Sequence, residues 1–124
     1  MDNSSYTVFI IDDDEVDRLS LSGPLVKAGY NVIEVDSGKN ILDKINDEKP
    51  DVVITDIIMP DIEGIEMIVA IKEQYPKLPV IAVSGTYYGE KYLNMAATLG
   101  ADRCLLKPAD PSTLLDLISQ LLNK

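Results

Sequence analysis

The segment VFIIDDDEVDR, residues 8–18, passes directly from four apolar residues to a cluster of acidic ones. Its apolar, β-branched start predicts a strand that is buried on both faces. Five carboxylates then follow at the end of the strand and in the next helical turn: Asp12, Asp13, Asp14, Glu15 and Asp17. Because like charges raise one another's pKa and oppose folding, a positive group is expected beside this cluster.

Short apolar runs recur along the whole chain. They are TVFII at 7–11, VIEV at 32–35, DVVIT at 51–55, VIAVS at 80–84 and RCLL at 103–106. Helical spacing of apolar residues between them predicts helices at about 14–27, 38–47, 64–74 and 89–99, and a last helix capped by Asp110 or Ser112. This alternation predicts an α/β fold with five strand–helix units and a parallel sheet. Gly23-Pro24 inside the first helix predicts a kink or a break there.

The composition limits the chemistry that the chain can perform. A length of 124 residues with 46% hydrophobic residues predicts one domain over residues 1–124. The chain has one cysteine, Cys104, and no histidine. An internal disulfide is therefore excluded, and the usual residues for zinc clusters and histidine-dependent nucleophilic catalysis are missing. Any metal is expected to bind to oxygen atoms.

Charge and hydropathy limit the partners and the location. The net charge of −10 predicts repulsion from nucleic acid and from anionic membranes, so cations and basic protein surfaces are the expected partners. The N-terminus lacks the pattern of a signal peptide, and no apolar run approaches the roughly 20 residues that span a bilayer. We therefore expect a cytoplasmic protein that does not bind membranes.

Polar side chains end or directly follow four of the predicted strands. In a doubly wound sheet, ligands bind beyond the carboxyl ends of the strands, at the point where the strand order reverses. The residues that the strands deliver to that edge are Asp12, Asp13, Asp56, Ser84 and Lys107. Taken singly, an acidic residue there caps the next helix, a serine begins a turn and Lys-Pro forms a loop. Their joint placement favours a functional site.

The chemistry that fits these residues is a carboxylate–metal site. Mg²⁺ prefers hard oxygen ligands and keeps several waters, which leaves positions for a phosphate. Asp12, Asp13 and Asp56 could hold such an ion, and its charge would explain the acidic cluster. Asp14 is interpreted instead as the cap of the first helix, and Asp17 as a solvated residue favoured by the helix dipole.

The motifs IIDDD, DVVITDIIMPDIEG, AVSG and LLKP occur in an order and spacing that resemble the receiver domain of two-component response regulators. The resemblance covers essentially the whole chain. It implies a flavodoxin-like, doubly wound (βα)5 fold with a five-stranded parallel sheet in the order 2-1-3-4-5. It also implies that an aspartate, Asp56 in this sequence, accepts a phosphoryl group from the phosphohistidine of a sensor histidine kinase or a phosphotransfer protein.

The resemblance implies further roles at the same site. Mg²⁺, or Mn²⁺ in its place, would be bound directly by Asp13 and Asp56, through water by Asp12, and by the backbone carbonyl of Ile58. Lys107 would offset charge on the phosphoryl oxygens and Ser84 would donate a hydrogen bond to them. Small Gly85 would leave room for the loop to move, and Lys107-Pro108 would be a cis peptide. The domain would catalyse its own phosphorylation and autodephosphorylation.

The resemblance also implies an output. The acyl phosphate would switch the surface formed by the fourth helix, the fifth strand and the fifth helix toward an effector protein or a fused domain. Cys104 stands where the family usually places an aromatic residue that swings inward, so coupling through a rotating ring is not expected. Tyr87, Tyr88 and Tyr92 either cover the fourth helix or form an aromatic surface for a partner.

Three other functions remain as alternatives. A Mg²⁺-dependent phosphoaspartate hydrolase usually needs a second aspartate two residues after the nucleophile, where this chain has Ile58. A flavin- or nucleotide-binding protein needs a Gly- or Ser/Thr-rich loop where this chain has Asp12-Asp13-Asp14. The third is a pseudo-receiver that is not phosphorylated and serves as an interaction module. The sequence does not distinguish a stand-alone regulator from a segment of a hybrid kinase or a multidomain regulator.

Overall fold

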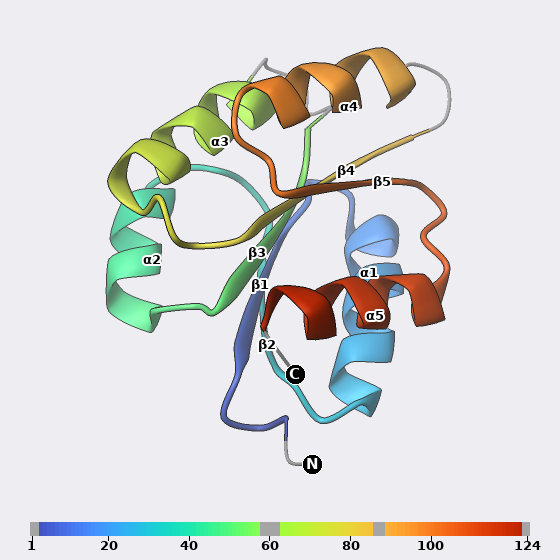
Figure 1. The fold of residues 1–124 in the computed structure, drawn as a ribbon. Helices are drawn as coiled ribbons and strands as arrows, with labels where there is room; N and C mark the ends of the chain where they lie inside the picture. The colour runs from blue at the N-terminus through green and yellow to red at the C-terminus, as the bar shows by residue number, and fades with distance from the viewer. Residues whose placement is uncertain (1–2, 58–62, 86–88, 123–124) are drawn as a thin grey trace.

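A computed structural model describes residues 3–57, 63–85 and 89–122, in which strands and helices alternate (Figure 1). The strands are β1 (Thr7–Ile11), β2 (Asn31–Val35), β3 (Val52–Asp56), β4 (Val80–Ser84) and β5 (Arg103–Leu106). The helices are α1 (Glu15–Lys27), α2 (Ile41–Glu48), α3 (Glu63–Gln74), α4 (Gly89–Thr98) and α5 (Pro111–Leu121). Every strand predicted from the sequence is present, with bounds that differ by at most one residue.

The strands form one parallel sheet in the order β2-β1-β3-β4-β5, which confirms the predicted fold class. The chain moves outward from β1 to β2, returns to β3 on the other side of β1, and continues to β5. The order therefore reverses between β1 and β3, which pair directly, with Ile10 opposite Ile54. Because all strands run the same way, their carboxyl ends lie along one edge of the sheet.

Two apolar layers cover the sheet. In Figure 1, α2 and α3 lie to the left of the strands with α4 above them, and α1 and α5 lie to the right. Phe9 and Val53 belong to the first core cluster, with α2, α3 and α4, while Ile10 and Ile54 belong to the second, with α1 and α5. Every residue of β3 and of β4 is buried. This burial on both faces explains why each strand begins with a continuous apolar run, and the polar residues Thr55, Asp56 and Ser84 come at the carboxyl ends.

Helix α1 continues through Pro24, so of the predicted kink or break the break is wrong, while the kink stays a prediction. The proline cannot donate to the carbonyl of Ser20, but Ser20 is exposed and water can take the place of the missing donor. Leu21 and Leu25, on the buried side of the helix, are almost completely excluded from solvent. Their burial holds the helix together across the proline, because packing of an apolar face outweighs one lost hydrogen bond.

The other helix bounds differ slightly from the predictions. Helix α2 begins at Ile41, after Asn40 in the left-handed conformation with φ of 58°, and so starts three residues later than predicted. Helix α5 is capped by Asp110, whose side chain accepts from the backbone N–H of Thr113, and not by Ser112. Among the residues that the structure describes, none of the helices is long and apolar enough to cross a membrane.

Candidate functional site

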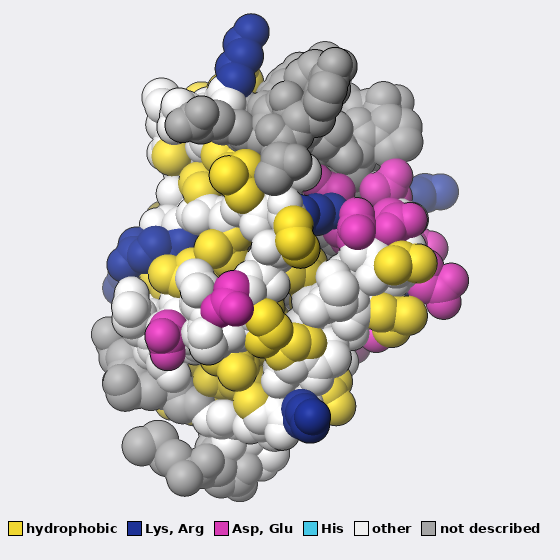
Figure 2. Space-filling model, turned by 90° about the vertical axis from the view of Figure 1, so that its right-hand side faces the viewer, with side chains coloured by type: hydrophobic (Ala, Val, Ile, Leu, Met, Phe, Trp, Pro, Cys, Tyr) yellow, Lys and Arg dark blue, Asp and Glu magenta, His cyan; other side chains and the backbone are white. Residues whose placement is uncertain are grey.

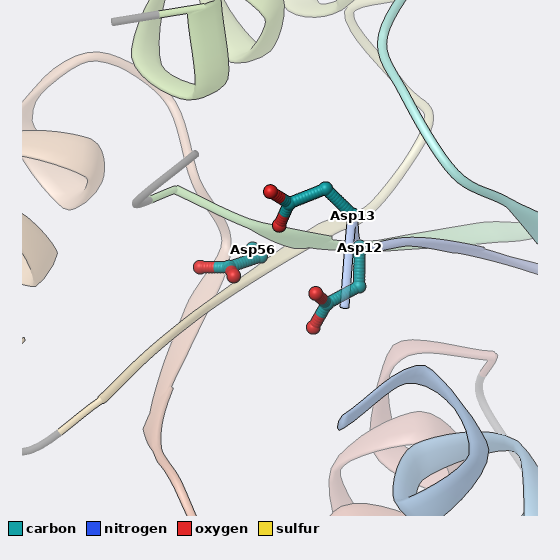
Figure 3. A group of neighbouring side chains, drawn as sticks. All are labelled: Asp12, Asp13 and Asp56. Carbon is teal, nitrogen blue, oxygen red and sulfur yellow. The ribbon is translucent and has the colours of Figure 1, made fainter. Parts of the chain in front are cut away.

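Three carboxylates meet at the point where the strand order reverses. Asp12 and Asp13 directly follow β1, and Asp56 is the last residue of β3. Figure 3 shows their side chains reaching from neighbouring strand ends into one region, and one oxygen of each lies within 4.8 Å of the others. Asp12 is 0% exposed and Asp56 is 5% exposed, whereas Asp13 lies at the surface. The structure therefore brings together the three residues that the sequence predicted.

The positive group expected beside the acidic cluster is Lys107, which follows β5. Its Nζ donates to Asp12 Oδ2 at 2.8 Å, to Asp17 Oδ2 at 3.0 Å and to Asp56 Oδ2 at 3.1 Å. Burial on its own lowers the pKa of Lys107, but the hydrogen bonds to these carboxylates raise it by more, so its pKa lies above the usual value. Lys107 is therefore a fixed ammonium ion at neutral pH.

Asp12 is held on several sides. Its Oδ1 accepts the backbone N–H of Asp14 at 2.9 Å, and its own backbone N–H donates to Val35 of β2 at 3.0 Å. The carbonyl oxygen of Asp12 accepts from Arg18 Nη1 at 2.7 Å, while Arg18 Nε lies 3.2 Å from Glu34 Oε1. Arg18 was not predicted as a site residue. The sequence did contain one signal for it: Arg18 is a basic residue in the first turn of a helix, where the helix dipole favours acidic residues.

Asp56 is positioned by the end of β3 and by the start of α3. The next residue, Ile57, donates its backbone N–H to Val83 at 3.1 Å, which continues the sheet past Asp56. A Cβ placed on Gly64 would lie 2.6 Å from both the Cα and the carbonyl oxygen of Ile57. Only glycine lets α3 approach the backbone beside Asp56 this closely. The carbonyl of Ile58, predicted to bind metal, lies outside the described residues.

Ser84 ends β4, the strand next to Asp56, and is completely buried. Its hydroxyl lies 3.4 Å from the carbonyl of Gly85, and its own carbonyl accepts the backbone N–H of Lys107 at 2.7 Å. The end of β4 is therefore tied to the lysine-bearing end of β5. Apart from its chain neighbours, none of the described residues comes within 4 Å of a Cβ placed on Gly85, and the role of Gly85 in loop movement stays a prediction.

The remaining predicted residues have mixed outcomes. The Lys107-Pro108 peptide is cis, as predicted. Cys104 is half-buried against the core, and its Sγ lies 3.4 Å from the carbonyl of Leu93 in α4. Burial raises the pKa of the Cys104 thiol, which agrees with a small apolar residue of a strand rather than a reactive one. Tyr87, Tyr88 and the side chain of Tyr92 lie outside the described residues.

The two acidic residues that were interpreted as structural behave differently. Asp14 is the cap of α1, and its Oδ2 accepts the backbone N–H of Asp17 at 2.9 Å, as predicted. Asp17 lies in the first turn of α1 and its side chain is partly solvated, as predicted, but its carboxylate also binds Lys107, which was not predicted. The two residues are 90 positions apart in the sequence, so only the folded chain reveals the contact.

The donor set fits a divalent cation. Asp12, Asp13 and Asp56 offer carboxylate oxygens, the hard ligands that Mg²⁺ prefers. Three carboxylates bring more negative charge than the single ammonium of Lys107 offsets, so the cluster has a remaining demand for positive charge. A doubly wound parallel sheet with an acidic cluster and a lysine at its reversal point is the architecture of flavodoxin-like signalling domains.

Comparison with known proteins identifies the family. The response regulator receiver domain profile matches residues 8–119. The chain belongs to this family, the receiver domains of two-component response regulators, which generally bind Mg²⁺ at an acidic pocket. The prediction made from the four motifs is therefore confirmed for family and fold.

Two relatives show the range of proteins in which such a domain occurs. The chain is 36% identical to the two-component response regulator ORR5 of Oryza sativa subsp. japonica over 119 residues, which cover 93% of this chain and 87% of the relative. It is 35% identical to the DNA-binding transcriptional regulator NtrC of Proteus hauseri over 113 residues, 91% of this chain. The match spans 24% of NtrC, so most of that protein has no counterpart in these residues.

Solved structures agree with the fold. A CheY-like response regulator receiver domain protein from Methanospirillum hungatei superimposes with a TM-score of 0.85 and 30% identity, and the match covers 95% of this chain and 94% of that one. A putative response regulator from Chloroflexus aurantiacus gives a TM-score of 0.88 with 26% identity, and covers 96% and 98% of the two chains.

Proposed function

We propose that Asp56 is the phosphoacceptor of this receiver domain and that residues 1–124 act as one phosphorylation-dependent switch. The observation that carries the proposal is the buried carboxylate of Asp56, placed within a carboxylate cluster and 3.1 Å from the ammonium of Lys107. A nucleophile held between a fixed cation and a metal-binding cluster has what phosphoryl transfer requires, namely positioning and charge neutralisation.

Asp12, Asp13 and Asp56 would hold Mg²⁺, with Mn²⁺ as a substitute and the carbonyl of Ile58 as a further ligand. When bound, the ion supplies positive charge to the oxygens of the transferred phosphoryl group. The buried position of Asp12 and its bonds to Asp14 and Arg18 fix one side of the cluster before any ion arrives. Preorganised ligands reduce the cost of binding.

The other steps belong to the chain's own residues. A carboxylate oxygen of Asp56 attacks phosphorus in line, and the bond from phosphorus to the histidine nitrogen breaks with its electron pair left on that nitrogen. Lys107 offsets charge on the phosphoryl oxygens, and the Ser84 hydroxyl turns from the Gly85 carbonyl to donate to one of them. In the reverse half of the cycle, water attacks phosphorus, releasing inorganic phosphate and restoring the carboxylate.

An effector protein or a fused domain would recognise the switch through the surface made by α4, β5 and α5. Ser84 and Lys107 lie at the ends of β4 and β5, so movement of either toward Asp56 pulls directly on the segments that lead into α4 and α5. Cys104 contacts α4 through Leu93, so a small side chain replaces the aromatic residue usual in the family at this junction. The two states then differ in loop position rather than in the orientation of a ring.

The donor would be a sensor histidine kinase or a phosphotransfer protein, and the output an effector protein or a fused domain. Relatives include the sensor kinase/phosphatase LuxN of Vibrio harveyi, of which the match spans 14%, and the DNA-binding regulator NtrC. We place the domain in the cytoplasm, where a free thiol such as that of Cys104 stays reduced.

Phosphorylation by a small donor tests this function. The intact mass is measured after incubation with acetyl phosphate, with and without Mg²⁺, on the wild type, on Asp56→Asn and on Asp51→Asn. Asp51 is a matched control, since it precedes β3 whereas Asp56 ends it. We expect one phosphoryl group, dependent on Mg²⁺, on the wild type and on Asp51→Asn but not on Asp56→Asn. A folded wild type that remains unmodified would contradict the proposal and favour a pseudo-receiver.

A further inference from the structure

We infer that Asp17 is a positioning residue that holds Lys107 in the unphosphorylated protein and releases it when Asp56 carries a phosphoryl group. This inference rests on the proposed role of Asp56. It assigns to Asp17 a part in the reaction although Asp17 lies on α1, outside the carboxylate cluster of Asp12, Asp13 and Asp56.

The first step is a count of hydrogen-bond donors. A lysine ammonium has three N–H groups and no more. Lys107 uses them on three acceptors, one oxygen each of Asp12, Asp17 and Asp56, at distances between 2.8 and 3.1 Å. A phosphoryl oxygen on Asp56 can therefore gain a donor from Lys107 only if one of these bonds is given up.

The second step is the cost of giving up each bond. Asp12 is 0% exposed, so loss of Lys107 would leave a buried carboxylate oxygen without this cation. The bond to Asp56 can be kept, because attack by Oδ1 leaves Oδ2 as a carbonyl oxygen that still accepts from Lys107. The side chain of Asp17 is 45% exposed, so water can replace the ammonium there. The bond to Asp17 is the one released at the lowest cost.

The third step is the placement of Asp17. Its backbone N–H donates to the capping carboxylate of Asp14, so the residue is fixed in the first turn of α1. Figure 2, which views the molecule from the right of Figure 1, shows acidic side chains gathered near the upper right edge of this face. Asp17 adds negative charge to a pocket that must accept a phosphoryl group, and this charge opposes the modified state.

The experiment uses beryllofluoride, a phosphoryl mimic that binds to carboxylates, in the presence of Mg²⁺. Asp17→Ala removes the acceptor but keeps the backbone N–H that the cap needs. Glu15→Ala is the matched control, because Glu15 is an exposed acid of the same helical turn. ¹⁹F NMR measures the affinity for beryllofluoride, and ¹⁵N NMR follows the ammonium signal of Lys107, assigned by its loss in Lys107→Arg.

We expect Asp17→Ala to bind beryllofluoride roughly two- to fivefold more tightly than both the wild type and Glu15→Ala, the range that exposed ion pairs produce. The Lys107 signals of the wild type and Asp17→Ala should differ in the free proteins and coincide in the bound ones. A purely structural role for Asp17 would not produce this convergence. If Asp17→Ala does not fold, Asp17→Leu, which also lacks an acceptor, serves for the same comparison.

Two results would overturn the inference. One is an affinity of Asp17→Ala that does not exceed that of Glu15→Ala. The other is a difference between the Lys107 signals that persists unchanged in the bound state. If instead the wild type binds no beryllofluoride, the proposed role of Asp56 fails together with the inference, and the two failures are thereby distinguished.

Discussion

The two ends of the sheet use aspartate in opposite ways. At the amino ends of the strands, Asp51 and Asp102 each precede one strand and bond to the first residue of its neighbour. The N–H of Thr7 donates to Asp51 Oδ2 and the N–H of Val80 to Asp102 Oδ2, both at 2.8 Å. In return, Thr7 and Val80 accept the backbone N–H of the same aspartates, also at 2.8 Å.

At the carboxyl ends, the same residue type meets a different partner. The cluster of Asp12, Asp13 and Asp56 has Lys107 as its cation and an excess of negative charge. At the amino edge, the first residues of β1 and β4 have backbone N–H groups that need acceptors. The carboxylates of Asp51 and Asp102 accept these N–H groups and so extend the hydrogen bonding of the sheet.

At the carboxyl edge, Asp12 also accepts one backbone N–H, from Asp14. The buried charge of the cluster, however, is offset by a cation, whereas the pairing of Asp102 with Lys72 at the amino edge is partly exposed. The difference teaches that an aspartate satisfied by backbone donors is structural, whereas one that requires a cation is available for chemistry.

The largest expected loss of stability comes from removing Lys107, the cation at the carboxyl ends of the strands, and the matching change at the amino ends should cost much less. Lys107→Met should lower the free energy of unfolding by about 3 kcal/mol at neutral pH, because Asp12 is buried and loses its charge partner. Lys72, whose Nζ lies 3.0 Å from Asp102 in a partly exposed pair, is the counterpart at the amino end. Lys72→Met should lower the free energy by less than about 1 kcal/mol. Urea denaturation measures both, and equal losses would refute the proposed asymmetry.

Lys107 also makes the free energy of unfolding depend on pH. Its pKa is raised in the folded state, so its contribution to stability is fully present below the unfolded pKa of about 10.4 and is lost as the pH rises above that value. The difference in unfolding free energy between the wild type and Lys107→Met should therefore be constant from neutral pH to about pH 10 and shrink at higher pH. A difference that grows in alkali would contradict the assignment of the charge.

The next largest effect separates the aspartates themselves. Asp102→Ala removes the acceptor of the buried Val80 N–H and should lower the free energy of unfolding by about 2 kcal/mol. Asp13→Ala relieves repulsion within the carboxylate cluster, and without Mg²⁺ it should leave stability unchanged or raise it by up to about 1 kcal/mol. Thermal and urea unfolding in a chelating buffer measure the pair. If Asp13→Ala destabilised the protein as much as Asp102→Ala, the distinction between structural aspartates at the amino ends and cation-dependent ones at the carboxyl ends would fail.

A further prediction concerns the close approach beside Asp56. Gly64→Ala forces a Cβ against the backbone of Ile57 at 2.6 Å and should cost about 2 kcal/mol, with slower phosphorylation. In Gly38→Ala the described atoms nearest to the new Cβ belong to the flexible side chain of Met67, with its sulfur at 2.7 Å, so the change should cost less than about 1 kcal/mol. Unfolding curves and acetyl phosphate kinetics test both variants. Normal phosphorylation by Gly64→Ala would show that the close approach does not position Asp56.

The smallest expected effect on stability concerns Asp110, the carboxylate that caps the amino end of α5. The pKa of Asp110 is lowered by hydrogen bonds from the Ser112 hydroxyl and from the backbone and hydroxyl of Thr113. Its contribution to stability is present above the unfolded pKa of about 3.9 and is lost as the pH falls through the lower folded value. The stability difference between the wild type and Asp110→Asn should therefore narrow in acid. A difference independent of pH would contradict this origin.

Much of the site was predictable because the topology needs only local patterns. Buried runs mark strands, and the parallel order places whatever follows them at one edge, which is enough to bring Asp12, Asp13, Asp56 and Lys107 together. The contact of Asp17 with Lys107 was not predicted because nothing near Asp17 in the sequence shows that Lys107 lies opposite. The break predicted in α1 did not occur because burial of Leu21 and Leu25 depends on the helix's neighbours.

The role of Gly64 shows the same limit. The sequence places it at the start of a helix, but only the folded chain shows that the backbone of Ile57 occupies the space of its missing side chain. Arg18 likewise acts through the carbonyl of Asp12, a contact set by how α1 is docked against β1. Local patterns predicted which groups converge, while the contacts that hold them in place depend on the packing of elements against one another.

The most direct test of the central claim locates the phosphoryl group. The protein is phosphorylated with acetyl phosphate and Mg²⁺ and treated with borohydride, which reduces an acyl phosphate to an alcohol and so converts a phosphorylated aspartate to homoserine. Peptide mass spectrometry then identifies the position. The account predicts homoserine at position 56, in the carboxylate cluster, and unmodified aspartate at 51 and 102. Homoserine at another aspartate, with Asp56 unchanged, would contradict it.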